Sequence, residues 1–303
     1  MHAAMQLREL RRLELAWLER SDYEAAATAL AAMTRLTALD FNNTLLGPGM
    51  LAALTGLRRL STLVDNFSEV AVLTRLVSLE LQALRSWALG SVAALSALTG
   101  LHSLTVMGMP EADLGQLGAL TALSHLDLSD TRMLRGLEAL QGMRRLKTLK
   151  VMYSERAAEG SLAALTALVA LTALHCNLAV WLTDLASLAA MTDLRELRAA
   201  RTPVVDLRPL AGLTRLRLLD VSCSGVTTLT PLAGLTRLRH LHLFRTDVAD
   251  LSPLSGLTQL SRLSTTHAVP GAVVAPMRRL ALLNDRYTDS APLCDFCASR
   301  RPT

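Results

Sequence analysis

One ten-residue phrase recurs in this sequence at a fixed interval of 22 residues. It reads Leu-Arg-Pro-Leu-Ala-Gly-Leu-Thr-Arg-Leu at 207–216 and returns with few changes at 229–238 and 251–260. Each copy runs into the pattern Leu-x-x-Leu-x-Leu, as in Leu216, Leu219 and Val221. In-phase copies of a unit this short predict a solenoid, because each unit buries its apolar side only by stacking on its neighbours.

The same pattern extends toward the N-terminus with less regular spacing. Further starts fall 19 to 26 residues apart, at Leu194, Leu171, Leu146, Leu123, Leu101, Leu76, Leu57, Leu36 and Leu10. We therefore expect about twelve turns of the solenoid, here called coils, over residues 1–267, with a degenerate thirteenth at Leu280 and Leu283. Residues 268–303 are richer in proline and polar residues and are predicted to form a C-terminal cap or tail.

Local patterns predict the structure inside each coil. The last two apolar positions of Leu-x-x-Leu-x-Leu alternate with other residues, which is typical of a short strand with one buried face. Prolines in the return segments predict short 3₁₀ turns, whereas the alanine-rich stretches 23–33 and 91–98 predict helical turns. A hydroxyl residue recurs where each strand turns, and we expect it to satisfy backbone groups there; the positions are Thr44, Thr131, Ser154, Thr202, Ser224 and Thr246.

At these residues the chain resembles the 22-residue class of leucine-rich-repeat proteins. The phrase Thr-Asp-Val-Ala-Asp-Leu-Ser-Pro-Leu-Ser-Gly-Leu-Thr at 246–258 is similar to the repeats of bacterial internalins and of the leucine-rich regulatory subunit of protein phosphatase-1. The resemblance extends from about Leu7 to Leu263. It implies an α/β solenoid, a curved right-handed coil with a parallel β-sheet on its concave side and 3₁₀ or short helical segments on its convex side. Its consensus residues are structural and do not identify a partner.

Composition agrees with a reused apolar unit and excludes several function classes. Hydrophobic residues make up 51% of the chain but aromatic residues only 3%, and the net charge is +5. The uncharged stretch 160–183 keeps the leucine spacing of the repeats and is interpreted as a buried coil rather than a membrane span. We find no secretory signal and no disulfide framework among the four cysteines, so we expect a cytoplasmic protein.

Binding is predicted on the concave face, where one solvent-facing residue of each strand forms a row. Its first half is mostly acidic and its second half mostly basic or imidazole: Glu14, Asp40, Ser61, Glu80, Thr105, Asp127, Lys150, His175, Arg198, Asp220, His242 and Ser264. We hypothesise a basic patch over the coils that start at Leu194, Leu216 and Leu238, with Phe244 and Tyr153 as aromatic anchors. The candidate partner-binding residues are Arg195, Arg198, Arg201, Arg217, Arg239, His242, Phe244, Arg245 and Tyr153. The alternative is that these arginines only solubilise an exposed face.

No catalytic constellation is found. The chain lacks a glycine-rich phosphate loop, a paired-histidine helix and a serine elbow, so we expect no catalytic residue, no metal and no cofactor. Cys294 and Cys297 supply half of a zinc site, which His267 or a second chain would have to complete, and they are interpreted as incidental. A metal or pH-sensitive site on the concave face is a further alternative; it would use His175, His240, His242 and His267.

The sequence thus predicts a non-catalytic protein–protein interaction module with a regulatory or scaffolding role and a partner of acidic surface. Nucleic acid is disfavoured as the partner, because Glu196 and Asp220 share the basic face and aromatic stacking platforms are few. The alternative function is the recognition portion of a larger enzyme or receptor, such as a ligase or an immune-type sensor. The first repeat begins near the start of the chain, at Leu7, so we expect an upstream domain, an interface or a poorly ordered first coil there.

Overall fold

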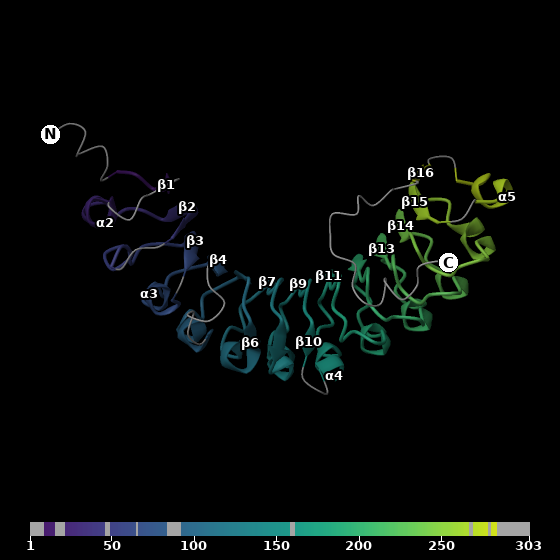
Figure 1. Cartoon of the computed structure of the whole chain (residues 1–303), viewed down its shortest axis with the longest axis horizontal. Coiled ribbons are helices and arrows are strands. Elements are labelled where there is room, and N and C mark those ends of the chain that lie inside the picture. The colour runs from purple at the N-terminus through teal and green to yellow at the C-terminus, as the bar shows by residue number, and fades with distance from the viewer. Residues whose placement is uncertain are drawn as a thin grey trace, which may run out of the picture. The chain divides into compact units, whose positions relative to one another are not determined.

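The computed structural model of the chain describes residues 9–15, 22–45, 49–64, 66–83, 92–157, 161–266, 269–277 and 280–283. The chain divides into two compact units, Met1–Leu146 and Lys147–Thr303. Within each unit the strands lie on one side and the helical segments on the other (Figure 1). Among the described residues, no helix combines the length and the apolar character that crossing a bilayer requires.

The first unit is built on a parallel sheet with one strand per coil. Its strands pair in chain order: β1 (Arg12–Glu14), β2 (Ala38–Leu45), β3 (Arg59–Val64), β4 (Ser78–Ala83), β5 (Ser103–Met107) and β7 (His125–Asp127). The register aligns the middle leucine of every coil, for example Leu60 with Leu79 and Leu79 with Leu104. The register shifts once, in β2 between Asp40 and Leu45.

Short helical segments return the chain between these strands. They are α2 (Tyr23–Ala31), α3 (Ser68–Ala71), η2 (Val92–Ala97), η3 (Leu114–Leu117) and η4 (Leu137–Gly142), where η denotes a 3₁₀ helix. Within the alanine-rich stretch 23–33, Tyr23–Ala31 form an α-helix as predicted, whereas within 91–98 Val92–Ala97 form the 3₁₀ helix η2. Two further strands, β6 (Glu111–Asp113) and β8 (Met133–Arg135), pair with each other in parallel, outside the main sheet.

The second unit repeats the plan more regularly. Its main strands again pair in parallel and in chain order: β9 (Thr148–Lys150), β11 (Ala173–His175), β12 (Glu196–Arg198), β13 (Leu218–Asp220), β14 (His240–Leu243), β15 (Arg262–Thr265) and β16 (Ala281–Leu283). The remaining elements are β10 (Arg156–Ala157), α4 (Ser161–Leu165), η5 (Ala186–Leu188), η6 (Arg208–Leu210), η7 (Thr230–Leu232), η8 (Ser252–Gly256) and α5 (Gly271–Val274).

Proline and aspartate define the start of the return segments in this unit. Pro209, Pro231 and Pro253 stand at the second position of η6, η7 and η8, which confirms the predicted 3₁₀ turns. The carboxylate of Asp206 accepts a 2.8 Å hydrogen bond from the backbone N–H of Arg208, and Asp250 accepts the equivalent bond from Ser252. Each carboxylate therefore satisfies a backbone donor that has no partner within the short helix.

The degenerate thirteenth repeat contributes a strand. β16 pairs in parallel with β15, with Leu282 opposite Leu263. It lies inside the segment for which we expect a cap, so strand pairing continues beyond residue 267. The domain boundary at 267/268 itself stays a prediction.

The core of each unit consists of leucine columns stacked from coil to coil. In the second unit Leu216, Leu219 and Val221 are fully buried, and their counterparts in neighbouring coils are equally inaccessible. Burying a leucine side chain contributes about 1.5–3 kcal/mol. Because this contribution repeats in every coil, the core needs very few aromatic side chains.

A hydroxyl residue closes the turn after most strands. Ser154, Thr202, Ser224 and Thr246 each donate a hydrogen bond of 2.6–2.9 Å to the carbonyl three residues earlier, as the sequence predicts. Thr131 occupies the same place and is fully buried, yet its hydroxyl has no hydrogen-bond partner among the described residues. The side chain of Thr44 lies outside the described residues.

In six coils the residue before the turn position adopts a left-handed backbone conformation; five of these coils carry a hydroxyl residue at the turn position, and the sixth carries Ala179. Its φ lies between 54° and 60° at six non-glycine residues: Asp130, Tyr153, Leu178, Arg201, Cys223 and Arg245. Its N–H is thereby directed to the next coil: Arg201 N–H donates to Ser222 O at 2.8 Å, and Cys223 N–H donates to Phe244 O at 2.7 Å. The coil-to-coil hydrogen bonding thus continues past the last strand residue, at the cost of backbone strain.

Candidate binding surface

The predicted row of strand residues exists in the second unit. Residue by residue, the register aligns Lys150, His175, Arg198, Asp220, His242 and Ser264. Two of the six differ from the expectation of a solvent-facing row, because Asp220 is only 5% exposed and Ser264 only 2% exposed. Asp220 does not face solvent because its carboxylate accepts a 3.0 Å hydrogen bond from the N–H of Ser222 at the following turn. The accessible part of the row is therefore shorter and less acidic than predicted.

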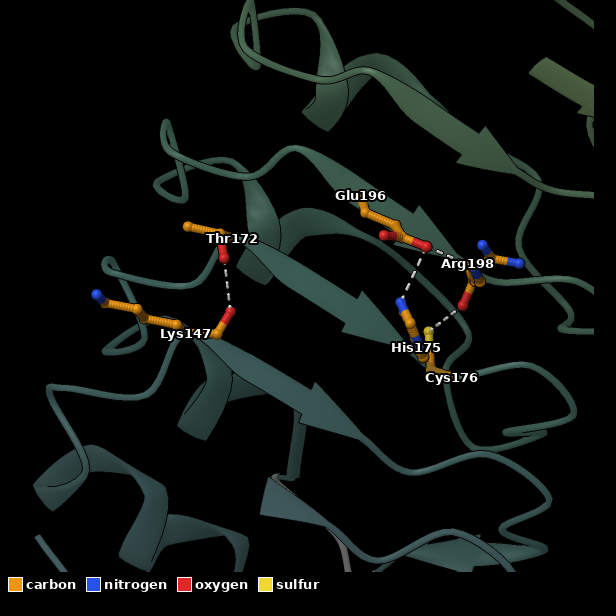
Figure 2. A network of polar contacts seen from close by, with 6 residues as sticks. All are labelled: Lys147, Thr172, His175, Cys176, Glu196 and Arg198. Atoms are coloured by element: carbon orange, nitrogen blue, oxygen red, sulfur yellow. Dashed lines mark hydrogen bonds and ion pairs between the residues drawn. The ribbon is translucent and has the colours of Figure 1, made fainter. Parts of the chain in front are cut away.

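A polar network occupies the centre of this face (Figure 2). Glu196 Oε1 accepts a 2.6 Å hydrogen bond from Arg198 Nε and lies 3.1 Å from His175 Nε2. The imidazole nitrogen is buried but does not reach hydrogen-bond geometry with any described atom. Arg198 therefore has its own carboxylate on the same strand, which lowers the positive charge that it offers to a partner.

Burial and neighbouring charges shift two pKa values in this network. Burial of His175 lowers its pKa, and the positive charges of Arg198 and Lys150 add to that effect against the opposing charge of Glu196. Burial of Glu196 alone would raise its pKa, but the hydrogen bond from Arg198 and the charge of His175 outweigh burial, so the pKa is lowered. At neutral pH the network holds a neutral imidazole beside an ionised Glu196–Arg198 pair.

Cys176 follows His175 directly but is unsuited to nucleophilic catalysis. Its side chain is fully buried directly after the end of β11, and its thiol donates to the carbonyl of Arg198 at 3.2 Å (Figure 2). Burial raises the pKa of the Cys176 thiol strongly, so the thiolate does not form at neutral pH. The adjacent histidine and cysteine therefore do not form an activated pair.

Most of the predicted arginines lie at the edge of the sheet where its strands begin. Arg195, Arg217 and Arg239 each stand one residue before β12, β13 and β14, and all three are exposed. The backbone holds them in line, because Arg217 N–H donates to Arg195 O and Arg239 N–H donates to Arg217 O, both at 2.8 Å. We call this edge, with its arginines, the strand-start edge.

Two further arginines at this edge lie outside the predicted patch. Arg215 and Arg237, each two residues before a predicted patch arginine, line a shallow hollow of about 290 Å³ together with Arg195 and Arg217. Arg215 forms an ion pair with Asp193, whose side chain is about half exposed. The sequence repeat indicates these two arginines, because the phrase Thr-Arg-Leu-Arg occurs at both 214–217 and 236–239, 22 residues apart.

The other candidates lie at the opposite edge, where the strands end. Tyr153 is 52% exposed there, and the guanidinium of Arg245 stands 5.4 Å from the centre of the Phe244 ring. Arg201 belongs to the same edge but is only 8% exposed, so our expectation that it adds accessible charge is wrong. Its backbone conformation does not account for this burial, because Tyr153 and Arg245 adopt the same left-handed φ at equivalent positions and are exposed.

The predicted patch is therefore split between the two edges of one sheet. Arg195, Arg217 and Arg239 lie at the strand-start edge, and Tyr153, Phe244 and Arg245 lie at the strand-end edge. The six residue steps from Arg239 to Arg245 span at most about 20 Å of extended chain, so a partner that touches both groups must cover the sheet face between them. Arg198 and the half-buried His242 occupy that face.

Comparison with known proteins gives matches among solved structures only; no family model and no curated protein matches the chain. An internalin of Listeria monocytogenes superposes with a TM-score of 0.66 at 18% identity, over 93% of this chain and 88% of that one. A leucine-rich-repeat protein of Leptospira interrogans gives a TM-score of 0.61 at 17% identity, over 91% and 78%. The chain has a leucine-rich-repeat fold. This confirms the predicted solenoid with its parallel sheet and short helical return segments.

A plant receptor shares the fold at larger size. The plant peptide hormone receptor RGFR1, solved in complex with RGF2, superposes with a TM-score of 0.61 at 16% identity. The match covers 90% of this chain but 49% of the receptor chain. At this level of identity the likeness concerns the leucine-rich-repeat architecture alone.

The first unit of the leucine-rich-repeat solenoid has a mixed rather than an acidic sheet face. The row Glu14, Asp40, Ser61, Glu80 is present in the strand register, but Arg12 and Arg59 stand two residues before Glu14 and Ser61 on the same strands. Arg12 forms a 3.0 Å ion pair with Glu14. A second hollow of about 420 Å³ lies across β1 to β4, and its lining includes Arg12, Arg59, Asp40, Ser61 and Glu80. The arginines two residues earlier on the strands thus offset the acidic charge predicted from the row of Glu14, Asp40 and Glu80.

Some candidates fall outside the part of the chain that the structure describes. They are His267, Cys294 and Cys297. Within the described ranges, no three His, Cys, Asp or Glu side chains gather in a way that would hold a metal ion. The pKa of His240, the first residue of β14, is lowered. Burial is the largest cause, followed by the charges of Arg262, His242, Arg239 and Arg198.

Proposed function

We propose that this leucine-rich-repeat protein is a non-catalytic interaction module that binds a protein of acidic surface through its second unit, in a regulatory or scaffolding role. The observation that carries the proposal is the strand-start edge. There Arg195, Arg217 and Arg237 are exposed and form no ion pair with any described carboxylate. Exposed arginines without a carboxylate are well suited to pair with acidic side chains of a partner.

The strand-end edge would supply the apolar part of the interface. Tyr153 is exposed, and Phe244 is half-buried beside Arg245. Tyrosine and arginine are among the residue types enriched at binding hot spots. The polar face between the edges, including Arg198 and His242, would then form hydrogen bonds of the kind found around such anchors.

The alternative function uses the same surface as the recognition portion of a larger enzyme or receptor. The observation in its favour is the plant receptor, of which this chain matches 49%. Under this alternative the binding residues are unchanged, and only the consequence of binding differs.

Affinity purification followed by mass spectrometry tests the proposal. The charge-reversal variant carries Arg195→Glu, Arg217→Glu and Arg239→Glu; Arg198 is left unchanged because Glu196 already pairs with it. The control reverses Arg156 and Arg208, which are exposed residues of the same unit outside the main sheet. Proteins retained by the parent and by the control but lost from the first variant are the expected result. Equal recovery from all three would refute the arginine edge as the binding surface.

A purified partner then permits a quantitative test. Its Kd should rise by about tenfold or more on reversal of the three arginines, mainly through loss of charge-assisted contacts. Tyr153→Ala should weaken binding independently, because that residue lies at the opposite edge of the sheet. Both arms use the full chain, and circular dichroism checks that each variant is folded.

A further inference from the structure

The hollow at the strand-start edge has an unusual lining. All four residues that line it are arginines, namely Arg195, Arg215, Arg217 and Arg237. They come from adjacent coils, since Arg215 and Arg217 precede β13 while Arg195 and Arg237 precede the strands on either side. Four guanidinium groups around one space repel each other unless an anion enters it. The hollow therefore favours an anionic occupant.

One carboxylate partly balances this charge. Asp193 holds Arg215 in an ion pair at the margin of the hollow. Arg195, Arg217 and Arg237 have no such partner among the described carboxylates. Three guanidinium forks, with five N–H donors each, are thus available to one ligand.

We propose that this hollow binds a phosphate monoester dianion carried on a serine or threonine of the protein partner; this inference rests on the proposed function. A phosphoryl group bears nearly two negative charges at neutral pH and three strong acceptor oxygens, which match several guanidinium forks at once. A single carboxylate offers one charge and two oxygens, and so satisfies one fork only. The hollow, at about 290 Å³, is large enough to admit the group.

The limits of the arginine cluster favour one phosphoryl group over a polyanionic chain. The position that Arg195, Arg217 and Arg239 occupy in their coils is occupied by Thr172 in the preceding coil and by Ser261 in the following coil. The position of Arg215 and Arg237 is occupied by Asp193 in the preceding coil and by Gln259 in the following coil. A nucleic-acid strand needs a longer basic track and stacking platforms. The cluster ends too soon for that.

A neighbouring hollow would receive the residues that flank the phosphoryl group. Arg239, Thr258, Gln259 and Ser261 line a space of about 490 Å³ at the same edge. Its Arg239 donates through the backbone to Arg217 of the first hollow, so the two hollows adjoin. Hydroxyl and amide groups there suit the polar backbone of an extended peptide.

Isothermal titration with defined peptides tests the proposal without the natural partner. The probe is a short capped peptide with one phosphoserine between small polar residues, in buffer free of phosphate and sulfate. Peptides with serine or aspartate in its place are the comparison. We expect saturable binding of the phosphopeptide, at least about tenfold tighter than the aspartate peptide, and competition by inorganic phosphate. Equal affinity for the three peptides would overturn the proposal.

Matched variants separate this site from bulk charge. Arg217→Gln together with Arg237→Gln removes two lining guanidiniums and should weaken the phosphopeptide by about tenfold or more. Arg156→Gln together with Arg208→Gln makes the same change in net charge elsewhere in the unit and should alter affinity less than about twofold. Equal losses in the two variants would reduce the effect to net charge. Tighter binding of a short single-stranded oligonucleotide than of the phosphopeptide would overturn the choice of partner.

Failure of this inference and failure of the proposed function are distinguishable. If a captured partner binds equally well before and after phosphatase treatment, the phosphoryl site is refuted while the interaction module stands. If the phosphopeptide binds at the arginines but the charge-reversal variant of the proposed function retains every partner, the site stands and the proposed interface is refuted.

Discussion

The hydroxyl of Thr202 donates a 2.7 Å hydrogen bond to the carbonyl of Ala199, three residues earlier, and so closes the turn at the end of β12. The same bond recurs at Ser154, Ser224 and Thr246. In many leucine-rich repeats an asparagine is expected at this place, and here a hydroxyl performs its role. The one departure among the described hydroxyls of this column is Thr131, which is buried without a partner.

This difference predicts opposite effects for one substitution at two equivalent positions. Thr202→Val removes a buried hydrogen bond and should lower the free energy of unfolding by about 1 kcal/mol. Thr131→Val replaces an unsatisfied buried hydroxyl with a methyl group of similar size and should be neutral or stabilising by up to about 1 kcal/mol. Urea denaturation of both variants measures this. Equal destabilisation would show that Thr131 is satisfied in solution.

Alternation along β13 gives a second matched pair. Leu219 is fully buried in a leucine column, whereas its neighbour Leu218 is partly exposed on the sheet face. Leu219→Ala should destabilise the protein by about 2–5 kcal/mol because it leaves a cavity. Leu218→Ala should cost less than about 1 kcal/mol. Similar losses in denaturant titrations would contradict the assignment of the two faces.

The fold was predictable from the sequence because its determinants are local and repeated. The leucine phrase fixed the strand positions, the prolines fixed the 3₁₀ turns, and even the weak match at Leu280 and Leu283 corresponds to β16. A solenoid needs no long-range pairing that a sequence pattern leaves hidden, since each coil contacts only its neighbours.

The binding surface was less predictable, for two physical reasons. Which side chain faces solvent depends on local contacts: Asp220 is buried with its carboxylate accepting from the Ser222 N–H, and Arg201 is buried although its position in the repeat suggested exposure. Charge also depends on the neighbouring row, as the pairing of Glu196 with Arg198 shows. The four-arginine hollow combines two positions of the repeat, that of Arg195 and Arg217 and that of Arg215 and Arg237. It becomes predictable only when both positions are compared between neighbouring coils.

Backbone strain at the strand-end edge predicts a difference between two truncations of Tyr153. This residue has φ of 59°, a conformation that glycine adopts freely and alanine does not. Tyr153→Ala and Tyr153→Gly both remove the ring, but the glycine variant should be more stable than the alanine variant by about 1 kcal/mol. Thermal or denaturant unfolding measures the difference. If alanine were equal to or better than glycine at this position, the left-handed conformation would not hold in solution.

The His175 network predicts that stability falls on mild acidification. The pKa of His175 is lowered in the folded chain, so between that pKa and its ordinary value the unfolded chain binds a proton that the folded chain does not. The stabilising contribution is therefore complete above about pH 6.5 and is lost as pH falls through the folded pKa. Glu196, whose pKa is also lowered, adds a loss of the same sign at lower pH, below its own ordinary range. Denaturant titrations from pH 7.5 to 5 should show a decline in the free energy of unfolding that is shallower in His175→Gln than in the parent. Adding His240→Gln should make the decline shallower still, because the pKa of His240 is lowered too. A decline of the same slope in the parent and in both variants would assign the acid sensitivity to other groups.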